Sequence, residues 1–145
     1  MAEVFFKKQK IFETGKGDVL HGLKSSDKSY HGFGEVYFSE ILYGSIKGWK
    51  KHKSMTMNLL VPLGKVAFVV IKSDQPNHKN LKIEEFILSK ENYGRLTVPP
   101  NHWVAFKGLE KNLSIIVNVS DIEHSDNEVE KKDIDEIKFN WREVV

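Results

Sequence analysis

Residues 48–66 read GWKKHKSMTMNLLVPLGKV, and they decide the expected fold because a cluster of cations and one imidazole stands just before a run that should enter a hydrophobic core. A second segment, residues 95–106, reads RLTVPPNHWVAF and carries another such run beside a double proline. Apolar runs bounded by Gly and Pro are typical of strands. The two segments together predict a small β-barrel with a polar pocket at its mouth.

Further β-type runs flank these two segments. Residues 36–43 are rich in β-formers, 65–71 form a continuous apolar run, and 114–119 supply another strand. Residues 81–88 are ambiguous in period, and their length and the loop before them favour a strand. Short strands separated by turns are typical of a sandwich or a closed barrel, so the fold class is expected to be all-β.

The length of 145 residues and the 40% hydrophobic content predict one domain, with an irregular N-terminal region over residues 1–33, a barrel core over 34–120 and an acidic C-terminal segment over 121–145. The net charge of +2 arises from 22 basic and 20 acidic residues, which is too balanced for a nucleic-acid partner. Basic residues crowd positions 47–53, so we expect local attraction of an anionic ligand.

The composition also bears on the compartment. The chain has no cysteine, which excludes disulfides and thiolate chemistry and fits a reducing environment. Its apolar runs are too short for a signal peptide or a membrane-spanning helix. We therefore expect a cytoplasmic protein without a membrane partner.

His52 is the candidate general base. Neighbouring lysines favour its neutral imidazole form, which can accept a proton near pH 7. Asp121 or Glu123 would pair with His52 and orient its ring, and Lys47 and Lys50 would hold a phosphate or diphosphate. The alternative is a solvated strand end whose lysines protect an edge from aggregation, with the acidic residues on the surface.

The double proline, Pro99-Pro100, would present His102 or Trp103 in one orientation, since proline fixes the backbone. Trp103 would stack on a base or a sugar, although a tryptophan entering a strand is also a common core residue. The further candidates for ligand binding in the two segments are Trp49, Asn58 and Arg95.

The sequence lacks the motifs of several common kinds of catalytic and cofactor-binding site. The six histidines are scattered, and no pair has the spacing of zinc ligands, so no metal site is expected. The chain contains no GxSxG, no phosphate-binding loop and no dinucleotide fingerprint, and we expect no cofactor.

The order of these elements resembles the cupin superfamily, specifically the dTDP-4-dehydrorhamnose 3,5-epimerase group. Residues 46–52 stand where that group has an Arg-Gly-Leu-His segment, and 63–70 resemble the strand that follows it. Residues 99–106 resemble the group's Pro-x-Gly-x-x-His-Gly-Phe segment, and 120–141 its acidic stretch ending in a tryptophan. The resemblance runs from Val36 to Trp141.

The resemblance implies a jelly-roll barrel (a double-stranded β-helix), a homodimer and a nucleotide-sugar ligand. The implied reaction is proton abstraction at C3 and C5 of a 4-keto-6-deoxy sugar nucleotide, without a metal. A histidine supported by an acidic residue acts as the base, and a tyrosine delivers the proton on the opposite face.

The chain departs from the group's motifs. The arginine is Lys47, the histidine has either moved to His52 or been replaced by Lys50, and the second histidine aligns with Val104. The segment that should carry the tyrosine, residues 120–124, has none.

Three interpretations follow. The first is an epimerase with His52 as base and His102 or Tyr43 as the second proton carrier. The second is a non-catalytic cupin that binds a sugar or a nucleotide sugar. The third is a structural partner protein that uses the barrel only to dimerise.

Overall fold

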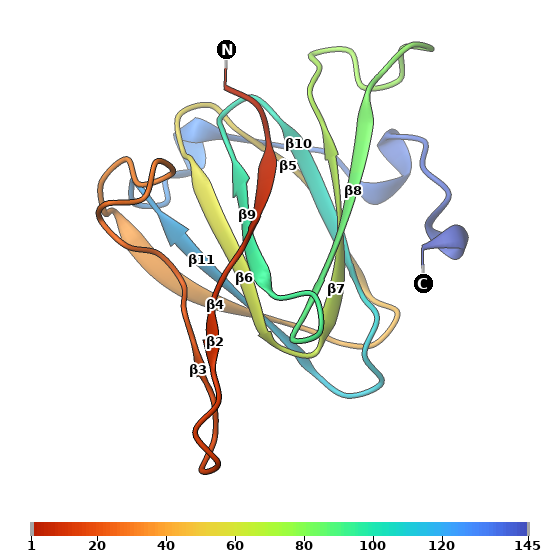
Figure 1. Ribbon diagram of the computed structural model, residues 1–145. Helices are drawn as coiled ribbons and strands as arrows, with labels where there is room; N and C mark the ends of the chain where they lie inside the picture. The colour runs from red at the N-terminus through yellow and green to blue at the C-terminus, as the bar shows by residue number, and fades with distance from the viewer. Residues whose placement is uncertain (1, 145) are drawn as a thin grey trace.

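The β-type runs of the sequence form two antiparallel sheets in the computed structural model, which describes residues 2–144 (Figure 1). The strands are β1 (Phe5–Lys8), β2 (Ile11–Phe12), β3 (Val19–Leu20), β4 (Glu35–Ile41), β5 (Ile46–His52), β6 (Met57–Leu63), β7 (Lys65–Ile71), β8 (Ile83–Ser89), β9 (Gly94–Val98), β10 (Trp103–Gly108), β11 (Ser114–Ser120) and β12 (Val129–Lys131). Three short 3-10 helices complete the elements: η1 (Asp126–Glu128), η2 (Ile134–Glu136) and η3 (Trp141–Glu143).

The first sheet has the strand order β1-β9-β6-β11-β4, and the second has the order β12-β5-β10-β7-β8. The two sheets face each other as a jelly-roll barrel, which confirms the predicted all-β class (Figure 1). Residues 81–88 lie largely in β8, as predicted. No helix in the described range 2–144 is long and apolar enough to cross a membrane.

The N-terminal region is more ordered than the sequence predicts. β1 pairs with β9, and β2 pairs with β3 in a hairpin that projects away from the two sheets (Figure 1). The prediction of an irregular region over 1–33 is therefore wrong for these strands. They are short and their pairing rests on main-chain hydrogen bonds, so their side chains show little periodicity.

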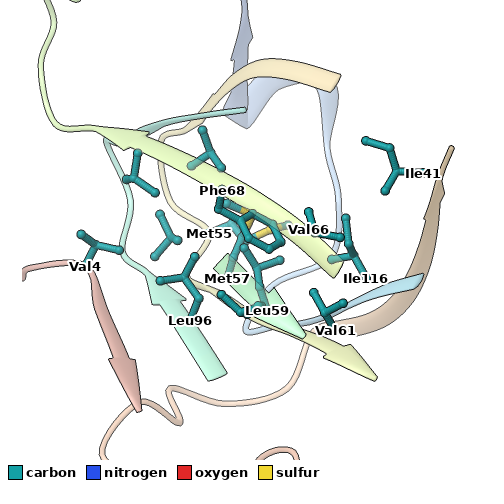
Figure 2. Close-up of a cluster of buried hydrophobic side chains, with 14 residues drawn as sticks. Val4, Ile41, Met55, Met57, Leu59, Val61, Val66, Phe68, Leu96 and Ile116 are labelled. Atoms are coloured by element: carbon teal, nitrogen blue, oxygen red, sulfur yellow. The ribbon is translucent and has the colours of Figure 1, made fainter. Parts of the chain in front are cut away.

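The main hydrophobic core lies between the two sheets (Figure 2). Alternate side chains of each strand point inward, since successive residues of a strand face opposite sides. Met57, Leu59 and Val61 enter from the first sheet, and Val66 and Phe68 enter from the second.

A second core lies on the outer side of the second sheet. Trp49 from β5 and Trp103 from β10 are buried there together with Ile137. Ile134, Phe139 and Trp141 pack against this cluster, so the C-terminal segment covers the outer face of the sheet. The segment that the sequence marks only as acidic thus has an apolar underside.

Candidate functional site

A cavity of about 190 Å³ lies inside the barrel between the two sheets. Six strands, β4, β5, β6, β7, β10 and β11, contribute its lining side chains. The lining residues are Tyr37, Ser39, Lys47, Gly48, Lys50, His52, Met57, Leu59, Phe68, Val104, Phe106, Ile116 and Asn118. Strand β5 therefore contributes two lysines and an imidazole to a cavity whose other lining residues are mostly apolar.

An irregularity in β5 brings both Lys47 and Lys50 to this cavity. In a regular strand two residues three apart face opposite sides of the sheet. Here Val104 of β10 lies opposite Lys50 while Phe106 lies opposite Lys47, so β5 contains one extra residue between them. The bulge shifts the alternation, and Lys47 joins Lys50 and His52 on the inner side.

Gly48 makes this bulge possible. Its φ of +147° belongs to a region that residues with a side chain rarely adopt. A Cβ at this position would lie 2.4 Å from the Cβ of Ala105 on the neighbouring strand β10. Only glycine allows the two strands to approach this closely.

His52 forms a buried pair with Glu128. Its Nδ1 hydrogen-bonds the Oε1 of Glu128, and the other carboxylate oxygen accepts bonds from the backbone N–H groups of Ser54 at 3.2 Å and Met55 at 3.3 Å. Burial by itself would raise the pKa of Glu128, but the hydrogen bonds from His52 and these two amides outweigh it and lower that pKa. The carboxylate is thus held in its charged form, and it orients the imidazole.

The expected pairing of His52 with Asp121 or Glu123 is wrong. Asp121 instead accepts a hydrogen bond at 2.8 Å from the backbone N–H of Thr56, and Glu123 is exposed. The reason is strand register, because β12 pairs with β5 so that Val129 lies opposite His52. Glu128 precedes Val129 directly and is the acidic residue that reaches the ring.

Lys47 and Lys50, which line the cavity, and Lys131, which lies beside Lys50, have no carboxylate partner among the described residues. Lys47 Nζ donates to the carbonyl of Glu40 at 2.6 Å, and neither Lys50 nor Lys131 forms an ion pair. Burial, then the charges of Lys131 and Lys47, lower the pKa of Lys50. Lys131 stands opposite Lys50 in the β12–β5 pairing, so the three ammonium groups form one region that would attract an anion.

Lys51 has a different role from its neighbour Lys50. It faces the outer side of the sheet, where it pairs with Asp74 at 2.8 Å and Glu130 at 3.4 Å. Burial opposes the charge on Lys51, yet these two carboxylates raise its pKa overall. This lysine stabilises the outer layer and is not free to bind a ligand.

The wall opposite His52 contains polar residues that the sequence reasoning missed. Tyr37 and Ser39 come from β4, and Asn118 comes from β11. Asn118 Nδ2 donates to the hydroxyl oxygen of Tyr37 at 2.9 Å. Alternation along the predicted strand 36–43 was the available signal, because Tyr37 and Ser39 share the face of the buried Ile41.

The two side chains expected to carry the second proton do not line the cavity. His102 is buried beside the double proline, with Nδ1 3.0 Å from the carbonyl oxygens of both Pro99 and Pro100. Tyr43 is 61% exposed and lies beside Gly108, past the end of β4. The structure brings neither of them together with His52.

The remaining ligand-binding candidates face away from the cavity, because they occupy outward positions of their strands. Trp49 and Trp103 lie in the second core, and the indole Nε1 of Trp49 donates to the carbonyl of Ile134 at 3.2 Å. Asn58 donates a hydrogen bond to the carbonyl of Ser29 and accepts one from the Thr97 hydroxyl. Arg95 donates to the carbonyl of Gly22 and forms an ion pair with Asp27. Both residues lie on the outer side of the first sheet.

A wider open groove of about 810 Å³ lies on that outer side, and Arg95 and Thr97 line it. His52, Lys47 and Lys50 do not line this groove. Within residues 2–144 no group of three or more His, Asp or Glu side chains is placed to hold a metal ion.

Solved structures of similar shape come from enzymes of sugar-nucleotide metabolism. A dTDP sugar isomerase from Desulfovibrio desulfuricans G20 has a TM-score of 0.88 and 28% sequence identity, over 98% of this chain and 92% of that one. A dTDP-4-dehydrorhamnose 3,5-epimerase from Sulfolobus tokodaii has a TM-score of 0.80 and 22% identity, over 94% and 80%. A sugar 3,4-ketoisomerase from Thermoanaerobacterium thermosaccharolyticum, in complex with TDP, has a TM-score of 0.73 and 15% identity, over 91% and 89%.

No protein-family model and no curated protein matches the sequence. The structural agreement nevertheless extends over nearly the full length of the isomerase from Desulfovibrio. The barrel, its inner cavity and these similarities lead to one conclusion: the chain has a cupin fold of the kind found in dTDP-4-dehydrorhamnose 3,5-epimerases and related dTDP sugar isomerases.

Proposed function

We propose that the protein epimerises a 4-keto-6-deoxy nucleotide sugar by removing a proton from a carbon next to the ketone, with His52 as the base. The observation that carries this proposal is the buried His52–Glu128 pair, whose imidazole lines a cavity with Lys50 and Lys47 on the same wall. Glu128 occupies Nδ1 and stabilises the imidazolium that forms when Nε2 takes the proton.

The lysines supply the other requirement of this chemistry. Removing a proton beside a ketone places negative charge on the ketone oxygen, and a cation nearby stabilises that enolate. Lys50 is next to His52 on the inner face of β5 and is suited to this role. Lys47, which lines the cavity, and Lys131, which lies opposite Lys50 in the β12–β5 pairing, are suited to the diphosphate.

The size of the cavity indicates which part of a nucleotide sugar could enter the barrel. At about 190 Å³ it has room for roughly six waters. One sugar ring fits such a space, whereas a whole nucleotide sugar does not. The sugar would enter the barrel, and the nucleotide would remain outside near the lysines.

The test is hydrogen exchange at the reacting carbons. The purified protein is incubated with dTDP-4-keto-6-deoxyglucose in deuterated water, and the sugar is analysed by mass spectrometry and proton NMR. We expect deuterium at C3, C5 or both, above a control without protein. Thermal stabilisation by the nucleotide sugar without any exchange would instead indicate the non-catalytic binding protein.

We also propose that the protein is a homodimer that associates through the outer face of β4. This strand is a free edge of the first sheet, and it exposes Phe38 by 69% and Val36 by 45%, next to Leu42 at 65%. Open edges and exposed apolar side chains favour association with a second copy.

Light scattering after size-exclusion chromatography tests the dimer. The wild type should elute with twice the chain mass of 16.7 kDa, and Phe38→Glu should elute as a single chain because it places charge in the contact. Ile83→Glu, on the edge strand β8 of the other sheet, is the matched control and should remain dimeric. A monomeric wild type would contradict the proposal.

A further inference from the structure

Epimerisation requires a second proton carrier on the side of the sugar opposite the base. A base that returns its own proton restores the original configuration, and inversion needs a donor on the other face. His52 belongs to the second sheet, so the donor must come from the first sheet, which forms the opposite wall of the cavity. The sequence-based candidates, His102 and Tyr43, lie outside this cavity.

The first sheet contributes two hydroxyl groups to the described lining, those of Ser39 and Tyr37, and a phenol gives up its proton more readily than an aliphatic alcohol. Tyr37 of β4 lines the cavity and lies directly opposite Asn118 of β11 in the strand pairing. Because the phenol oxygen accepts the hydrogen bond from Asn118 Nδ2, its own O–H proton is not used in that bond. No other described residue accepts the phenolic proton of Tyr37, which remains available to a ligand.

Asn118 supplies an independent sign that this wall meets a ligand. The residue is 1% exposed, and its Oδ1 has no hydrogen-bond partner among residues 2–144. Met57, Leu59 and Ile116 are apolar neighbours in the lining and cannot donate to this oxygen. Leaving a buried acceptor unpaired is unfavourable, and a sugar hydroxyl in the cavity would satisfy it.

We propose that Tyr37 is the second catalytic residue of this cavity and that Asn118 is the residue that positions it; the inference rests on the proposed epimerase function. His52 Nε2 takes the proton from the carbon beside the ketone, and the electrons of that C–H bond form the enolate. The enolate carbon then takes the phenolic proton of Tyr37 on the opposite face, which forms the inverted C–H bond.

The step balances without an oxidant or a reductant. The phenolate left on Tyr37 is stabilised by the N–H of Asn118, and it regains a proton from water. The imidazolium of His52 gives its proton to water.

The experiment measures exchange and inversion separately in Tyr37→Phe. The variant is incubated with dTDP-4-keto-6-deoxyglucose in deuterated water; mass spectrometry reports exchange, and NMR coupling constants report configuration. We expect exchange within about threefold of wild type, because His52 is intact, and inversion reduced by about 100-fold or more. Tyr43→Phe, which changes a tyrosine outside the cavity, should match wild type in both.

Asn118→Leu provides a second, nearly isosteric variant. It removes the donor to Tyr37, so inversion should fall by about tenfold while exchange persists. Asn118 acts through Tyr37, so the same change in the Tyr37→Phe background should reduce inversion no further. A purely structural effect of Asn118 would instead lower exchange and inversion together in both backgrounds.

The outcomes separate this inference from the proposed function. If the wild type exchanges and inverts while both Tyr37→Phe and Asn118→Leu invert at the wild-type rate, Tyr37 is not the donor and the epimerase proposal stands. If inversion is lost in Tyr43→Phe instead, the second carrier is that residue. If the wild type shows no exchange, the function and the inference both fall.

Discussion

Replacing His52 with alanine is expected to lower deuterium incorporation beside the ketone by about 10²–10⁴-fold, the usual contribution of a general base. His52 has the only ring nitrogen among the described cavity-lining residues that can act as a base. Its pairing with Glu128 prepares it to take a proton. Affinity for dTDP should change little, because the lysines at the mouth are retained. Exchange measured by mass spectrometry and affinity measured by calorimetry test the two statements separately.

The matched control is His78→Ala, which removes an exposed histidine in the loop between β7 and β8. It should exchange at the wild-type rate. Normal exchange by His52→Ala would show that another group is the base, and Lys50 would then be the next residue to replace. Loss of dTDP binding together with exchange would show that His52 serves the fold and not the chemistry.

Replacing Trp49 with alanine is expected to lower the free energy of unfolding by about 3–5 kcal/mol, the range for deleting a buried aromatic side chain. Trp49 is fully buried, its indole donates to Ile134, and its ring centroid lies 5.8 Å from that of Trp141. The change removes a buried contact between the second sheet and the C-terminal segment. Urea denaturation followed by circular dichroism measures the loss.

The control for this substitution is Leu63→Ala, which truncates a side chain that is 55% exposed at the end of β6. It should alter the free energy of unfolding by about 0.5 kcal/mol or less. If Trp49 instead stacked on the ligand, its replacement would lower ligand affinity and leave the free energy of unfolding unchanged. Unchanged stability combined with lost nucleotide-sugar binding would support that role.

Much of the barrel could be predicted from residues 36–119, because most strands there carry a continuous or alternating apolar pattern; β5, whose residues are largely cationic, does not. The cations of the cavity were also accessible, since Lys47, Lys50 and His52 crowd one strand end. The sequence does not predict that Lys47 and Lys50 face the same side of the sheet. Their shared orientation depends on a bulge at Gly48, which shifts the inward and outward alternation of side chains along β5. Simple alternation would have separated Lys47 from Lys50.

The partner of His52 lay beyond sequence reasoning for a different reason. Glu128 is one of several acidic residues between 121 and 136, and nothing in their order distinguishes it. The choice depends on the pairing of β12 with β5, and a strand of three residues has no readable period. The tryptophans were misplaced because their outward positions become buried only when the C-terminal segment covers them.

Asn118 and Tyr37 show what stricter use of alternation could have found. Both sit at inward positions of strands that the sequence identifies, next to the buried Ile41 and Ile116. A polar residue at a core position is unusual and points to a ligand or a network. The lysines and His52, which are the more conspicuous residues in the sequence, lie on the other wall, in β5.

The docking of residues 126–144 on the outer face of the second sheet completes the candidate site. These residues follow strands β1 to β11 in the chain, and they bring Glu128 to a histidine that lies 76 positions earlier. Until then the barrel has its cavity and its lysines but an unpaired imidazole, and Trp49 and Trp103 are uncovered. In the mechanism proposed above, the base therefore gains its carboxylate partner only when this segment docks on the sheet.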